Sequence, residues 1–184
     1  ETLFLSAGKK IITEENLEVL ALCTLQDYPD HRPLRDTVGM IEESDAIPVI
    51  PWAVGKWLGK RGNVLEELLK DPEREFFYLC DNGNRPNFWP WPRHFKDAQR
   101  NGIPIIAGSD PLHFASEADR TGSFGFVLPE TISFENPAAD IHRLLREKAS
   151  SVYLYGSLES GFRFIRNQIL MQIFKKKWRQ ALVR

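Results

Sequence analysis

The stretch Gly102-Ile-Pro-Ile-Ile-Ala-Gly-Ser-Asp110-Pro-Leu-His113 decides the predicted fold of this chain. Its isoleucines form a short apolar run bounded by turn-forming residues, a pattern typical of a fully buried strand in a parallel sheet. The carboxylate of Asp110 follows directly after this strand. In α/β sheets and barrels, ligands and metals bind at the carboxyl ends of the strands. The stretch therefore predicts both a parallel sheet and the edge of that sheet where function is found.

Outward from this stretch, apolar runs alternate with amphipathic helical runs, which predicts strand-helix-strand units with right-handed crossovers and a parallel sheet. An open doubly wound sheet and a barrel both fit this order, but no glycine-rich dinucleotide fingerprint or phosphate loop follows any strand. No linker or repeat interrupts the chain, so residues 1–184 are expected to form one domain that ends in a long helix. Strands are predicted at 3–5, 18–24, 47–52, 75–80, 103–107 and 151–155, and helices at 34–43, 64–69, 93–100, 137–148 and 159–182.

Composition gives the chain no overall electrostatic preference for a class of partner. The 184 residues are 42% hydrophobic and 27% charged, with a net charge of −1, so no global field favours nucleic acid or an anionic membrane. No apolar run approaches the roughly 20 residues that span a bilayer. The basic run Lys175–Arg179 is interpreted as a solvated helix end, with phosphate contact as the alternative. Cys23 and Cys80 lie in apolar runs and are expected to be reduced thiols, which favours a cytoplasmic setting.

Polar and aromatic side chains follow the predicted strands. Parallel strands would bring these groups to one face, where they resemble the lining of a small-molecule pocket. Lys56 and Arg85 are the cations suited to an anionic ligand. Each group also has a purely structural interpretation: a turn at 81–84, a cap at Asp110, a packed loop histidine at 113, and solvated loop charges at 56 and 85. The candidates are Trp52, Lys56, Asp81, Asn82, Asn84, Arg85, Asp110 and His113.

No catalytic triad, zinc-spaced cysteine pair or His-Glu-x-x-His motif is present. Instead, the order of the pieces across residues 18–128 resembles a polymerase-and-histidinol-phosphatase (PHP) domain. In that family a late strand ends in Gly-Ser-Asp-x-His and is followed by a glycine-containing segment. Gly108-Ser109-Asp110 and Gly122-Ser123-Phe-Gly125 match these two features. The stretches 79–83 and 93–104 resemble the family's preceding strand end and helix.

The resemblance implies a distorted, parallel β/α barrel of the TIM type, of which this chain would be the C-terminal two-thirds. It also implies a site for divalent metal ions (zinc, manganese or magnesium) and hydrolysis of phosphoesters. Asp110 matches a metal ligand of the family, and His113 stands one position beyond the family's histidine. Asp81 and Asp27 are further candidate ligands. The family's early His-x-His pair is not in this chain and is expected upstream of Glu1.

Three functions follow from these observations. The first is a metal-dependent hydrolase that acts on a small phosphorylated or otherwise anionic substrate, with Asp110 and His113 as the catalytic and metal-binding residues. The second is a non-catalytic barrel that has lost the metal-binding histidines and binds an anionic or sugar ligand against its aromatic walls. The third is an interaction module that uses the Pro- and Trp-rich loop Arg85–Pro92 as a partner surface. The oligomeric state stays open.

Overall fold

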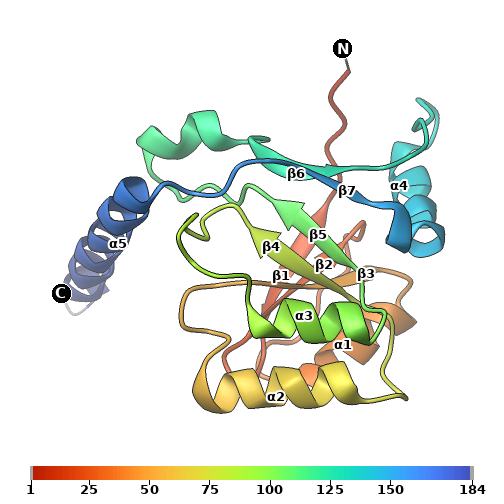
Figure 1. The fold of residues 1–184 in the computed structure, drawn as a ribbon, viewed down its shortest axis with the longest axis horizontal. Helices are drawn as coiled ribbons and strands as arrows, with labels where there is room; N and C mark the ends of the chain where they lie inside the picture. The colour runs from red at the N-terminus through yellow and green to blue at the C-terminus, as the bar shows by residue number, and fades with distance from the viewer. Residues whose placement is uncertain (1, 183–184) are drawn as a thin grey trace.

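The computed structural model describes residues 2–182, which form an α/β fold around a five-stranded sheet (Figure 1). The strand order is β1-β2-β3-β4-β5, and β6 and β7 form a separate hairpin. The strands are β1 (Gly8–Ile12), β2 (Glu18–Leu22), β3 (Ile47–Pro51), β4 (Tyr78–Asn82), β5 (Ile105–Gly108), β6 (Phe124–Val127) and β7 (Tyr153–Gly156). The helices are α1 (Leu34–Glu43), α2 (Gly59–Lys70), α3 (Arg93–Arg100), α4 (Pro137–Glu147) and α5 (Gly161–Leu182), with short 3-10 helices η1 (Ala115–Arg120) and η2 (Ala149–Ser151).

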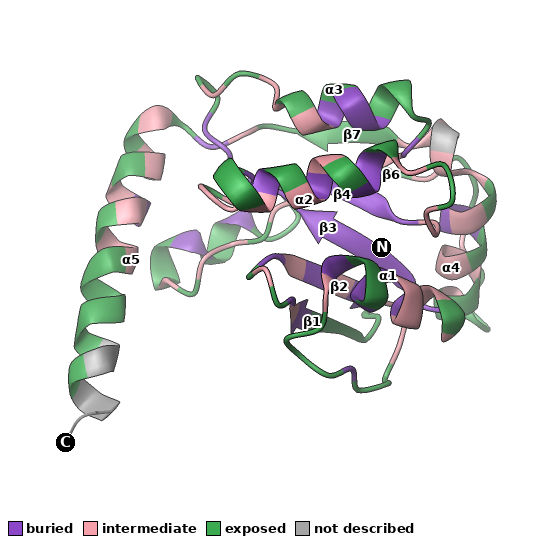
Figure 2. Cartoon of the chain, turned by 90° about the horizontal axis from the view of Figure 1, so that it is seen from below, coloured by how far each residue is buried: buried purple, intermediate pink, exposed green. Residues whose placement is uncertain are grey.

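The parallel part of the sheet agrees with the sequence prediction. β3, β4 and β5 are parallel neighbours, with Pro51 opposite Cys80 and Asn82 opposite Gly108. The helices α2 and α3 connect them, and Figures 1 and 2 show α1, α2 and α3 together on one face of the sheet. The α/β class is therefore confirmed, and the carboxyl ends of three strands do meet at one edge.

The expected closed, all-parallel barrel is not what residues 2–182 form. The sheet is open and mixed, because β1 and β2 are a hairpin and β2 runs antiparallel to β3. The hairpin turn closes through Thr13, whose backbone N–H donates to Leu17, and Asn16 adopts a left-handed backbone with φ 61°. The strand expected at 3–5 is absent, and Leu3 and Leu5 are exposed.

Two apolar cores lie on the two faces of the sheet. On the helix side, Ile50 and Leu79 pack against α1, α2 and α3 together with Val38, Leu65 and Phe95. The alternate residues of the same strands face the other way, as the period of two in a strand requires. These are Val49, Tyr78 and Cys80, and they meet Leu145 of α4 and Phe126 of β6.

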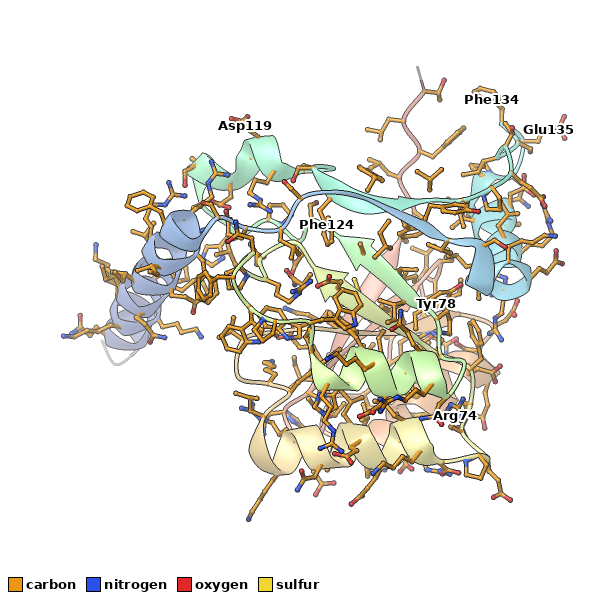
Figure 3. The ribbon with its side chains drawn as sticks, in the orientation of Figure 1. Arg74, Tyr78, Asp119, Phe124, Phe134 and Glu135 are labelled. Carbon is orange, nitrogen blue, oxygen red and sulfur yellow. The ribbon has the colours of Figure 1, made fainter. Side chains whose placement is uncertain are left out.

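Tyr78 anchors the second core. Its ring lies where β4 passes beneath the hairpin and α4 (Figure 3), and its hydroxyl donates a hydrogen bond to the backbone oxygen of Leu145. Burial raises the pKa of this phenol well above its usual range. Among the described residues, no helix combines the length and the apolar character that crossing a bilayer requires.

Candidate functional site

The carboxyl edge of β3, β4 and β5 brings together several of the predicted side chains. Asp81 and Asn82 end β4, and both are buried. Trp52 follows β3, and Asp110 comes two residues after β5. Loop 83–92 connects this edge to α3, so the aromatic residues of that loop also lie here.

Asp81 and Arg85 form a buried ion pair at this edge. The guanidinium donates two parallel hydrogen bonds, Nε to Oδ1 at 2.8 Å and Nη2 to Oδ2 at 2.7 Å. Their side chains are only 2% and 4% exposed. Arg85 also donates to the backbone oxygen of Trp89 at 3.1 Å and lies 5.3 Å from the ring centre of Trp91. Both charges are therefore satisfied inside the protein, and Arg85 holds the aromatic loop in place.

Asn82, Asn84 and Asp110 form a hydrogen-bonded group that joins two loops. The amide of Asn82 donates to the Asp110 carboxylate, and the amide of Asn84 donates to the Asp110 backbone oxygen. The Asn82 side-chain oxygen accepts from the Asn84 backbone N–H at 2.8 Å. Asp110 itself has a left-handed backbone with φ 39°, an uncommon conformation for a residue with a side chain.

Gly83 allows this close approach of the loops. Its backbone N–H donates to Gly108 at 2.8 Å. A Cβ atom at Gly83 would lie 2.9 Å from the backbone oxygen of Ser109 and 3.0 Å from its Cα, which is closer than real Cβ atoms approach backbone. Of the turn expected at 81–84, only Gly83 and Asn84 form a turn, because Asp81 and Asn82 belong to β4. This turn also positions the carboxylate of Asp110.

Three other predicted residues lie in different surroundings. Lys56 is paired with Glu18 of β2, Nζ to Oε1, at 2.7 Å. His113 packs its ring against Phe114 and against Phe174 of α5, with ring centres 4.9 and 4.4 Å apart. Asp27 pairs with Lys9 at the surface, and this hydrogen bond lowers the pKa of Asp27 and raises that of Lys9.

The described side chains do not fit the metal site that the PHP resemblance implies. No three His, Cys, Asp or Glu side chains among them converge in a way that could hold a metal ion. Both carboxylate oxygens of Asp81 are bound to Arg85, and one oxygen of Asp110 accepts from Asn82. His113 turns toward α5. No protein-family model matches the sequence, and no curated protein matches it either.

A second buried ionic group was missed from the sequence. Arg120 contacts Glu159 at 2.6 Å, and Arg166 of α5 contacts Glu117 at 2.6 Å. Arg120 also donates to the backbone oxygen of Gly83, which links this group to the carboxyl edge. Glu117 and Arg120 are three positions apart on η1, a spacing that indicates a shared face. Their partners could not be predicted, because they lie some 40 or 50 positions further along the chain.

Tryptophans enclose a cavity at the carboxyl edge. It measures about 320 Å³. Trp52 and Trp57 are buried, whereas Trp89 and Trp91 are partly exposed and pack against the helix-side core. Trp52 meets Trp89 edge to face at 5.8 Å, and Trp57 meets His94 in the same way at 5.5 Å. The lining consists of Trp52, Ala53, Gly55, Trp57, Leu58, Trp89, Pro90, Trp91, Pro92, Arg93 and His94, hereafter the tryptophan pocket.

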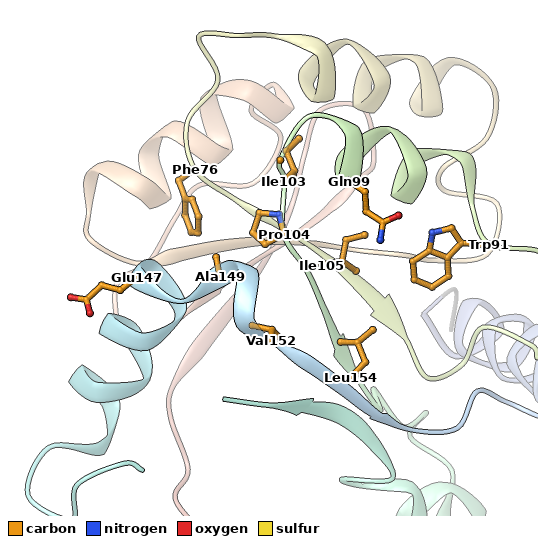
Figure 4. A pocket seen from close by; sticks show the side chains of 11 residues that line it. Phe76, Trp91, Gln99, Ile103, Pro104, Ile105, Glu147, Ala149, Val152 and Leu154 are labelled. Atoms are coloured by element: carbon orange, nitrogen blue, oxygen red, sulfur yellow. The ribbon is translucent and has the colours of Figure 1, made fainter. Parts of the chain in front are cut away.

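A larger cavity of about 560 Å³ shares Trp91 with the tryptophan pocket and otherwise has a different lining (Figure 4). Gly102, Ile103 and Pro104 line it, so it opens beside the amino end of β5, and η2 and β7 form its other wall. Glu147 is the one ionisable side chain in its lining, which offers little for ligand orientation. The tryptophan pocket, at the edge where α/β sheets bind ligands, is therefore the better candidate.

Proposed function

We propose that this chain is a small-molecule binding protein and that its ligand is a sugar ring held in the tryptophan pocket. The supporting observation is the convergence of four of the five tryptophans on one cavity at the carboxyl ends of β3 and β4. Its volume lies at the lower end of the range for ligand pockets. The C–H faces of a sugar ring are apolar and flat enough to stack on indoles.

The polar groups at this pocket suit a ligand with oxygen acceptors. Arg93 and His94 lie in its lining at the start of α3. The Arg93 side chain is 70% exposed and contacts Glu66 at 2.9 Å, so part of its guanidinium stays open to a ligand. A sugar presents hydroxyl and ring oxygens around its rim, to which the open part of the Arg93 guanidinium can donate. His94 already contacts the backbone oxygen of Gly62 through Nε2 at 3.0 Å.

Binding is favoured over hydrolysis because the cations predicted to neutralise a substrate are already paired with carboxylates of the protein. Lys56 neutralises Glu18, and Arg85 neutralises Asp81. The ion pair instead supports binding, since Arg85 donates to the backbone oxygen of Trp89 and contacts the ring of Trp91, which fixes both residues in position. Packing of Trp89 and Trp91 on the core also argues against the loop as a free partner surface.

Saturation-transfer NMR against a panel of neutral monosaccharides, disaccharides and a uronic acid tests this proposal, with tryptophan fluorescence giving the dissociation constant. Trp89 lines this pocket and not the larger cavity, so Trp89→Ala should weaken binding at least about tenfold. Phe88→Ala is the matched control, because Phe88 is 60% exposed in the same loop and does not line the pocket. Circular dichroism checks that each variant is folded.

Two results would contradict the proposal. One is the absence of saturable binding by every sugar in the panel. The other is an equal loss of binding in Phe88→Ala and Trp89→Ala, which would place the ligand outside the pocket.

A further inference from the structure

Helix α5 extends away from the rest of the molecule. Figures 1 and 2 agree that it projects from one end, with its C-terminal half clear of the sheet. Its first turns are fixed by the buried ionic group: Arg166 contacts Glu117, which is fully buried, and the adjacent Asn167 is buried as well. Arg163 lies 3.9 Å from Glu159. The helix is thus held at its base in a defined direction.

One face of α5 is apolar and exposed. Phe162, Ile165, Ile169 and Ile173 are spaced by three, four and four residues, so they form a stripe along one side. Their exposed fractions are 83%, 57%, 56% and 47%. The opposite side faces the body, where Phe174 meets His113. A helix that is apolar on both sides is expected to be covered on both.

The charge of α5 defines what would cover the stripe. No acidic residue follows Glu159 in the sequence, whereas seven of the 24 basic residues do. Lys175, Lys176 and Lys177 are all exposed near the end of the helix, beyond the stripe. All 25 acidic residues lie at or before Glu159. The protein is therefore bipolar, with an acidic body and a basic, partly apolar projecting helix.

We propose that α5 lies on an anionic lipid bilayer, with the stripe in the interface and the lysines at the lipid headgroups. A stripe of four side chains is far narrower than the roughly 20–30 residues per side of a stable protein interface. At a bilayer surface, cation attraction to the headgroups adds to a modest apolar insertion. The acidic body is repelled by the same surface, so the charge distribution orients the protein with α5 toward the bilayer.

Vesicle flotation of the whole chain tests this inference. Vesicles of phosphatidylcholine alone are compared with vesicles containing about 30 mol% phosphatidylserine, at low and at high salt. Ile165→Gln/Ile169→Gln removes two apolar side chains from the stripe and should abolish flotation. Glutamine is chosen because it is a good helix former. Lys175→Gln/Lys176→Gln/Lys177→Gln should weaken binding to the anionic vesicles about 100-fold at low salt. Leu25→Gln, at an exposed apolar residue outside α5, is the matched control and should float like the parent chain.

The outcomes distinguish a lipid bilayer from a second copy of the chain as the surface that covers the stripe. Flotation that requires phosphatidylserine, falls with salt and is lost in both α5 variants supports the inference. Absence of flotation on anionic vesicles overturns it. So does concentration-dependent self-association in sedimentation that Ile165→Gln/Ile169→Gln abolishes, if no vesicle binding accompanies it, because the stripe then covers a second copy of the chain.

Discussion

Arg85→Ala should be among the most destabilising substitutions in this protein. It removes a cation whose side chain is 4% exposed and leaves the Asp81 carboxylate, 2% exposed, without its partner. Breaking a buried pair by removing one partner costs about 3–5 kcal/mol, because the remaining charge is desolvated and uncompensated. The Trp89 backbone oxygen loses its donor as well. We expect a loss near 4 kcal/mol in the free energy of unfolding, a large fraction of a typical total of about 5–15 kcal/mol.

Equilibrium unfolding in urea measures this loss. With a slope of about 2.5 kcal/mol/M, a 4 kcal/mol change moves the midpoint down by about 1.6 M. Asp81→Asn keeps the shape of the partner without its charge. The double variant Asp81→Asn/Arg85→Ala should be more stable than the sum of the single effects predicts, with a coupling of about 2 kcal/mol or more.

An exposed arginine that pairs with a carboxylate provides the control. Arg100 contacts Asp97 at 3.2 Å, but its side chain is 76% exposed, so Arg100→Ala should cost less than about 1 kcal/mol. A similar small loss for Arg85→Ala, or additive effects of the two substitutions at 81 and 85, would refute the view that this pair is buried and mutually dependent.

Three further predictions concern the frame of the site. Burial raises the pKa of the Cys80 thiol far above its ordinary value of 9.0, so a thiol reagent should modify Cys23 first and Cys80 only on unfolding. Because the thiol ionises more readily in the unfolded chain, the free energy of unfolding measured by urea titration should fall as the pH rises above about 9. Gly83→Ala should lower stability by about 1–3 kcal/mol in the same assay, since its Cβ would meet the facing backbone; a neutral effect would contradict the close approach of the loops. Tyr78→Phe removes the donor to Leu145 and should cost about 1 kcal/mol by thermal unfolding, whereas an unchanged midpoint would show that water replaces the bond.

The sequence predicted the local elements on the helix side of the sheet. The runs at 34–43 and 93–100 match α1 and α3. In α1 the buried residues recur at helical spacing, and after α3 the Asn101-Gly102 pair is a stop signal. β1 was missed because Lys9 and Lys10 dominate a strand whose first three residues are exposed, so it lacks the apolar run that marks a buried strand. Once β1 was missed, the β1–β2 hairpin could not be expected, and β2 was assigned to a parallel sheet.

The candidate site shows a different limit of sequence reasoning. Strand ends could be located, so Asp81, Asn82 and Asp110 were correctly placed at one edge of the sheet. The partners of charged groups depend on contacts between distant segments. Lys56 pairs with Glu18 across 38 positions, and no local pattern reveals that contact. The Asp81–Arg85 spacing of four was visible, but this pair lies in a loop, where helical spacing carries no expectation.

These pairings change what the polar residues of the edge can do. A cation that is free to meet a ligand and a cation that is bidentate to a buried carboxylate are identical in sequence, yet only the first can neutralise a substrate. Arg85 belongs to the second kind, and its remaining contacts are to Trp89 and Trp91. In the proposed binding function, recognition at this edge would therefore rest on the aromatic faces that the ion pair holds in position. A ligand with a flat apolar face fits that arrangement better than a phosphate, whose binding would require Arg85 to leave Asp81 uncompensated in the interior.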